Sequence, residues 1–487
     1  MNRAQMMKTV SMVVLAIAVL TSINPVEAGT PRPFASTGSI QTVSDTAGAT
    51  LLGPYFEVDL SNPTGMNTIF TVNNMGATMV TVSGNFTFTN PSGPTAVLGH
   101  VVIWSDLGVP VFNFNIYLTG YDVERIDMRK VLNGLLPQTA SAGQDPSDIL
   151  SPKGPLSQDI NFASCNKPQN YVAPLNSFPV FLPGPLSLAQ INNLQTSLTG
   201  QASVGASGKC AGANHNDNIA RGYMTIDTVN NCTARFPGDP GYIGASGSGD
   251  ATNQTQLTGE VFYVDQLHAI ARGNNMVHIH ADTADPLTNT SGNYTFYGRY
   301  DGFTAIDNRQ PLPTSFGARY LNGNFTGAAV TAPTSPAWGA PPTSPPPGST
   351  SLIVWRDSKV AQAYFTCGSL PSPYPLGQEG ITAFDEQEHP QVVTSVNNVP
   401  LFTFGPGFPI ATQVVKVGSS ALPVSFTSGW IYLNLNHSAA PGPPIDTAAA
   451  QAWVEVMEQN GSQLFNIMHH AQAEDSGTLP NHTVPGH

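Results

Sequence analysis

The sequence predicts an all-β fold of two or three antiparallel β-sandwich domains of immunoglobulin-like type, with one short helix. Only 10% of the 487 residues are charged, while glycine (46) and proline (42) are abundant, which is typical of β-rich exported proteins with many turns. Hydrophobic residues make up 40% of the chain, too many for a disordered protein. Short alternating apolar and polar runs recur about every ten residues, the spacing expected of sandwich strands.

Residues 1–28 have the features of a secretory signal peptide. Lys8 contributes to a positive start, residues 9–20 form a short apolar run, and Ala28 is a small residue suited to cleavage. The apolar run is too short to span a bilayer, and no later segment reaches the length of a spanning helix. We therefore expect a protein that is secreted, periplasmic or on the cell surface, with no membrane insertion of the mature chain.

The first predicted domain follows a flexible lead-in over residues 29–50. Residues 51–134 carry strand-like runs separated by Gly, Pro and Asn, and we interpret them as an immunoglobulin-like β-sandwich. The clearest run is 111–118, where Phe112 and Phe114 share one face with the following Ile and Leu. Such modules are usually scaffolds or binding units, and the fold alone implies no activity.

Residues 135–327 are predicted to form a second β-rich domain, which begins with a long polar connection. Residues 186–200 form the best helix candidate, because Ser187 and Gln190 make a capping box and Gly200 suits the C-terminal stop. Later runs in which apolar and polar residues alternate predict strands over residues 223–229, 261–264, 276–281 and 294–300.

A Pro/Ser/Thr-rich linker or surface loop is predicted over residues 328–350, followed by a third β-rich region over 351–471 and a flexible tail over 472–487. Its clearest predicted strands are 414–417, 424–426 and 430–435. Near the end of this region, two apolar runs flank Asn460-Gly461, a strong hairpin signal. A helix over 447–458 is the competing interpretation of residues 452–470, because several alanines favour it.

Two stretches, 218–232 and 429–436, give the chain a resemblance to a family. In these stretches the sequence resembles uncharacterised secreted bacterial β-rich proteins. The resemblance covers little of the chain and implies no activity.

Four cysteines are predicted to form two disulfides, because an even number of cysteines in an exported chain favours pairing. They are Cys165, Cys210, Cys232 and Cys367. None belongs to a Cys-x-x-Cys pair, which argues against a zinc ribbon or a thioredoxin-like site. Three connectivities are open.

The sharpest candidate for a functional site is the Met-Val-His-Ile-His-Ala-Asp stretch. If it is a strand, His278, His280 and Asp282 share one face, and the apolar residues between them share the other. Two imidazoles in this arrangement can hold one zinc or copper ion. The competing interpretation is two histidines on the polar face of a half-buried strand.

Two further stretches carry weaker signals. The loop after this strand is rich in side chains with oxygen ligands, which suggests a structural calcium ion. These side chains are Asp282, Asp285, Asn289 and Asn293. Clustered aromatics at 294–303 suit either sugar or partner recognition or the filling of a core.

The functional prediction follows from charge and motifs. A net charge of −13 argues against nucleic acid as a partner. The sequence contains neither a G-x-S-x-G nor an H-E-x-x-H motif. We therefore expect a secreted or cell-envelope structural, adhesive or binding protein without evident catalytic activity, whose partner is a glycan or a surface protein. The alternative is an extracellular enzyme that uses zinc or copper bound by His278 and His280.

Overall fold

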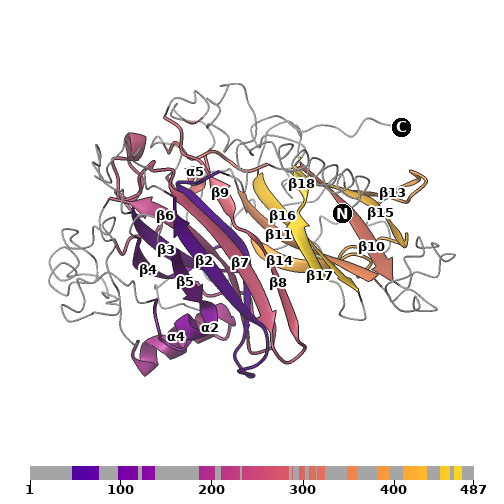
Figure 1. Ribbon diagram of the computed structural model, residues 1–487, viewed down its shortest axis with the longest axis horizontal. Helices are drawn as coiled ribbons and strands as arrows, with labels where there is room; N and C mark the ends of the chain where they lie inside the picture. The colour runs from indigo at the N-terminus through magenta and orange to yellow at the C-terminus, as the bar shows by residue number, and fades with distance from the viewer. Residues whose placement is uncertain are drawn as a thin grey trace, which may run out of the picture. The chain divides into compact units, whose positions relative to one another are not determined.

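The protein is mostly β-strand, as a computed structural model shows (Figure 1). The structure describes residues 46–75, 97–118, 123–137, 186–202, 210–230, 233–283, 288, 295–301, 307–313, 315–323, 348–358, 381–393, 410–435, 450–460 and 466–473. All of them belong to one unit, Ile40–His487. The strands form three sheets, and the neighbouring strands within them run antiparallel, which confirms the predicted antiparallel all-β class.

The first sheet has five strands in the order β4-β3-β6-β1-β9. They are β1 (Thr50–Asp59), β3 (Val97–Ser105), β4 (Pro110–Leu118), β6 (Ile219–Val229) and β9 (Val277–Ile279). Strand β6 is central and pairs with both β1 and β3. Every residue of β3 is buried, as are the last eight of β6, so both faces of this sheet are covered.

The second sheet has four strands in the order β5-β2-β7-β8. They are β2 (Asn67–Asn74), β5 (Val123–Asp127), β7 (Leu257–Asp265) and β8 (Ile270–Asn275). In β2, partly exposed and buried residues alternate, because only one face packs on a core. That core joins Phe70 and Val261 of this sheet to Leu51 and Val101 of the five-stranded sheet.

The third sheet has nine strands, seven of them in the order β13-β12-β15-β10-β11-β16-β17, while β14 pairs with β11 and β18 with β10. They are β10 (Ser315–Gly323), β11 (Gly348–Ser358), β12 (Thr382–Phe384), β13 (Pro390–Val392), β14 (Thr412–Lys416), β15 (Ser428–Asn434), β16 (Ala450–Asn460), β17 (Asn466–His470) and β18 (Gln472–Ala473). Its core includes Trp355, Val454 and Ile431, and it packs on Trp104 and Tyr223 of the five-stranded sheet. The five-stranded sheet thus has a hydrophobic core on each face.

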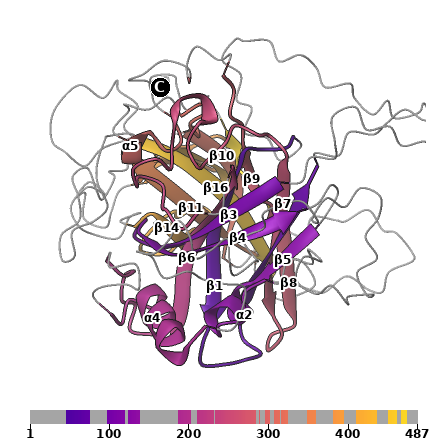
Figure 2. The same ribbon diagram turned by 90° about the vertical axis from the view of Figure 1, so that its left-hand side faces the viewer.

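The described residues also contain three α-helices and one 3-10 turn. They are α2 (Met128–Leu132), α4 (Leu188–Leu198), α5 (Gly298–Asp301) and η1 (Ala245–Gly247). Helix α4 is the predicted helix, and its capping box between Ser187 and Gln190 is present. Its buried residues Leu194 and Leu198 pack into the core shared by the first two sheets. Helix α2 lies beside it (Figure 2). None of the described helices is long and apolar enough to cross a bilayer.

Strand pairing does not follow the predicted domain order. Strands β1 to β5 come from the first predicted domain, yet they share their sheets with β6 to β9 from the second. Likewise, β10 lies before the predicted linker and pairs with β15 after it. The boundaries placed at residue 134 and at the 328–350 linker therefore separate strands that share a sheet.

Within the stretch 452–470, residues 452–460 and 466–470 belong to two strands, so the described part of this stretch is strand and not helix. Strands β16 and β17 pair antiparallel, and β16 also pairs along its whole length with β11. Both faces of β16 are buried from residue 451 to 458, so ladder hydrogen bonds and packing outweigh the helix preference of its alanines.

Two predicted strands are wrong. Residues 295–297 form a turn that leads into α5, which begins at Gly298, and 424–426 lie outside any strand. The backbone N–H of Tyr297 donates to the Asp307 side chain (3.1 Å) rather than to a neighbouring strand. The signal peptide, most of the lead-in, most of the 328–350 segment and nearly all of the tail lie outside the described residues.

Candidate functional site

The predicted metal ligand His278 lies on β9, whose residues alternate between faces as expected. Val277 and Ile279 pack into one core with Leu52. His278 points to the other side and is only 2% exposed. Its Nδ1 lies 2.7 Å from the Thr46 carbonyl oxygen, and its Nε2 accepts from the Gly259 backbone N–H (3.1 Å). Both ring nitrogens are therefore used by backbone groups, and a ring whose Nε2 accepts from the Gly259 N–H carries its proton on Nδ1.

The other two predicted ligands have different surroundings. His280 is 8% exposed, and its Nε2 lies 2.7 Å from the Thr46 hydroxyl. Burial lowers the pKa of His280, and so does the neighbouring His278. Asp282 is exposed, and its backbone N–H donates to the Asn308 carbonyl (3.0 Å). The two histidines thus fasten the segment around Thr46 to the sheet.

No cluster of three or more His, Cys, Asp or Glu side chains that could hold a metal occurs within the described ranges. Zinc or copper at His278 and His280 stays a prediction, as does calcium, because Asp285, Asn289 and Asn293 lie outside those ranges. Of the cysteines only Cys210 is described; it is buried and is not a free thiol. The pairing with Cys165, Cys232 or Cys367 stays open.

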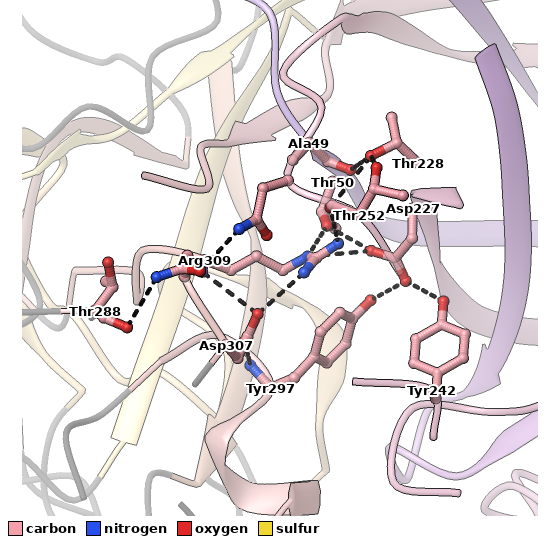
Figure 3. A network of polar contacts seen from close by, with 12 residues as sticks. Ala49, Thr50, Asp227, Thr228, Tyr242, Thr252, Thr288, Tyr297, Asp307 and Arg309 are labelled. Carbon is pink, nitrogen blue, oxygen red and sulfur yellow. Dashed lines mark hydrogen bonds and ion pairs between the residues drawn. The ribbon is translucent and has the colours of Figure 1, made fainter. Parts of the chain in front are cut away.

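A cluster of buried charged residues that was not predicted from the sequence lies around Asp227 of β6 (Figure 3). Its Oδ1 accepts from the Thr50 hydroxyl, and its Oδ2 accepts from the hydroxyls of Tyr242 and Tyr297, the latter at 2.9 Å. Burial raises the pKa of both tyrosines, and the Asp227 charge raises it further. Both phenols therefore keep their protons and act as donors.

Arg309 supplies the positive charge of this network. Its Nη1 lies 3.0 Å from Asp307 Oδ1, and its Nε lies 3.5 Å from Asp227 Oδ1. It also donates to the Thr50 hydroxyl (2.6 Å) and the Thr252 carbonyl (2.9 Å). Burial alone would lower the pKa of Arg309, but the charges of Asp307 and Asp227 raise it. The guanidinium stays charged between two carboxylates.

The Asp227 network, meaning Thr50, Asp227, Tyr242, Tyr297, Asp307 and Arg309, is fully enclosed, since each member is 1% exposed or less. It joins the five-stranded sheet to the segments around 242, 297 and 309 (Figure 3). Because its polar groups are satisfied by one another and out of contact with solvent, the network suits a structural role rather than chemistry on a substrate.

The aromatic cluster predicted at 294–303 is also internal where it is described. Phe296 and Tyr297 are 2% and 1% exposed, and Tyr300 packs against Trp104 with ring centroids 5.5 Å apart. For these residues the core interpretation is confirmed. Arg299 lies over the Tyr300 ring (4.3 Å) and pairs with buried Asp357 (2.8 Å).

On the nine-stranded sheet an exposed tryptophan lies beside two half-buried aromatic residues. Trp430 of β15 is 39% exposed, and its cross-strand partners are Phe384 and Arg319. Tyr432 lies two residues along the same face, because side chains alternate. We call Phe384, Trp430 and Tyr432 the aromatic face. The intervening Ile431 points into the core, so the aromatic face lies on the opposite side of the sheet from this core.

Polar and apolar groups border the aromatic face. Arg319 binds Glu458 through both carboxylate oxygens, with Nη2 2.8 Å from Oε2 and 3.1 Å from Oε1. On the other side lies Val392, which is 63% exposed. The face therefore combines flat rings with a fixed charged pair, as surfaces that recognise amphipathic ligands do.

Comparison with protein-family models, curated proteins and solved structures found no match to this chain.

Proposed function

We propose that the protein is an exported, non-catalytic binding protein of the cell envelope or the extracellular space, and that its aromatic face holds a carbohydrate. The observation that carries the proposal is the exposure of Trp430 between Phe384 and Arg319 on the nine-stranded sheet. A folded chain normally buries tryptophan, so a half-exposed ring beside a second aromatic residue marks a surface for a ligand.

A sugar ring fits this surface chemically. One side of a pyranose presents C–H groups that stack on an aromatic ring, and its hydroxyls reach out to polar neighbours. Arg319 is 64% exposed and held by Glu458, so its remaining N–H groups are positioned without a further loss of side-chain entropy. A flat, shallow surface of this kind suits a polysaccharide chain better than a small molecule, which prefers a concave pocket.

The proposal also includes the finer fold and the location. The facing five-stranded and four-stranded sheets support a β-sandwich of immunoglobulin-like type, although their strands come from both predicted domains. The signal-like start of the sequence supports export, and the even number of cysteines supports an oxidising compartment.

The test is binding of the mature protein to a panel of insoluble and soluble polysaccharides, with Trp430→Ala as the variant. We expect a ligand whose affinity falls about tenfold or more in Trp430→Ala, because a lost stacking contact of about 1.5 kcal/mol corresponds to about a factor of ten.

The matched control is Phe262→Ala, which removes an aromatic side chain of similar exposure, 37%, from the four-stranded sheet. Its binding should stay unchanged. Absence of binding across the panel, or equal losses in the two variants with unchanged thermal stability, would refute the proposal.

A further inference from the structure

A second buried polar cluster lies where an edge of the nine-stranded sheet meets an edge of the four-stranded sheet. Strands β17 and β8 are the edge strands, and they are in contact (Figure 1). Glu455 of β16 is completely buried there, opposite His470 of β17. Asn274 of β8 donates to Glu455 Oε1 (3.4 Å) and lies 3.2 Å from His470 Nδ1. We call Glu455, His470, Asn274 and Trp453 the Glu455 junction.

The hydrogen bond from Trp453 determines the protonation state of His470. Its indole N–H, which can only donate, points to His470 Nδ1 (3.1 Å). Nδ1 therefore accepts and carries no proton, so the Glu455 Oε1 that lies 3.6 Å away faces a neutral ring nitrogen. Glu455 thus gains no counter-charge from the histidine in this arrangement.

Among the residues that the structure describes, the other groups around Glu455 supply no positive charge either. Tyr263 of β7 also interacts electrostatically with Glu455, and burial raises the pKa of this tyrosine. Arg272 of β8 is part-buried, and its charge interacts electrostatically with Tyr263, Glu57 and Asp265. Glu455 Oε2 has no hydrogen-bond partner among the described residues. Burial raises the pKa of Glu455 to about 8, so the closed junction holds a neutral carboxylic acid.

We propose that the Glu455 junction is a pH-sensitive latch between β8 and the β16–β17 pair. With its proton, Glu455 is a neutral buried group and the two edges stay together. Without it, a negative charge lies among neutral donors in a low-dielectric interior, and opening the β8–β17 contact lets water reach the carboxylate. Below about pH 8 and above the ordinary carboxyl range, the closed state holds one proton more than the open state, so each rise in pH across this window favours opening.

The test is hydrogen exchange of the full mature chain, followed by mass spectrometry from about pH 6 to about pH 9 and corrected for the intrinsic pH dependence of exchange. In the wild type, protection of β8 and β17 should fall up to about tenfold per pH unit as the pH rises towards about 8, because one proton is released on opening, and it should level off above that pH. In Glu455→Gln this protection should not depend on pH, because the amide does not ionise.

The matched control is Glu458→Gln, on the same strand but paired with Arg319, which should retain the wild-type pH dependence of β8 and β17. A second measurement needs no variant: infrared titration of the wild type should show a protonated carboxyl band at neutral pH that disappears near pH 8. Any one of three results would overturn the proposal. The protonated carboxyl band is absent, the wild-type protection of β8 and β17 does not change with pH, or this protection falls with pH equally in Glu455→Gln.

Discussion

Replacing Arg309 tests whether the Asp227 network holds the fold together. Arg309→Met keeps much of the side-chain volume but removes the guanidinium between Asp227 and Asp307. Both carboxylates are 1% exposed or less, so they are left buried without a positive partner. Breaking a buried ion pair from one side costs about 3 to 5 kcal/mol. The free energy of unfolding of a typical domain is about 5 to 15 kcal/mol, so this loss is a large part of it.

The assay is urea unfolding followed by tryptophan fluorescence. The midpoint of Arg309→Met should fall, and a second substitution, Asp307→Asn, should recover part of the loss, because the two residues are in direct contact. Arg125→Met is the matched control, since Arg125 is 60% exposed and its pair with Asp127 is solvated, so we expect a change below about 1 kcal/mol. A loss for Arg309→Met as small as that of the control would refute the structural role of the network.

Two further substitutions test neighbouring parts of the structure. Tyr297→Phe removes one donor to the Asp227 carboxylate and should lower the free energy of unfolding by about 1.5 to 3 kcal/mol in urea titrations; an unchanged midpoint would contradict the hydrogen bond. His278→Ala leaves the Thr46 carbonyl and the Gly259 amide without their partner, so thermal unfolding should occur at a lower temperature. The alternative prediction, a metal site at His278 and His280, is checked by elemental mass spectrometry. Near-stoichiometric zinc or copper in the wild type, lost in this variant, would favour a metal site over a purely structural role of His278.

Local features of the fold could be predicted from the sequence. Helix α4 was predictable because Ser187, Gln190 and the leucine spacing are all short-range signals. The faces of β9 were predictable because alternation is fixed within one strand. The alternation did not reveal that His278 would be buried as well, since that depends on Gly259 from another sheet. A sequence pattern gives the faces of a strand but not what covers them.

The Asp227 network could not be predicted, because its members are brought together only by the fold. Thr50 and Arg309 are 259 residues apart in sequence and in direct contact. The available signal was an aspartate within the otherwise apolar or Thr-containing run Tyr223–Val229. A carboxylate there must be paired if the strand is central. The aromatic face was missed for a related reason: Phe384 and Trp430 become neighbours only when β12 pairs with β15.

The pairing of β1 with β6 and β9 has a consequence for how the chain is made. Strand β1 leaves the ribosome long before residues 219–229 and 277–279 exist, so it waits without its sheet partners. Closing such long loops costs entropy before any ladder hydrogen bond is gained, and folds built this way form slowly. Strand β1 must therefore wait for its sheet partners during synthesis, whereas β3 can pair with β4, and β2 with β5, as soon as these strands have been made.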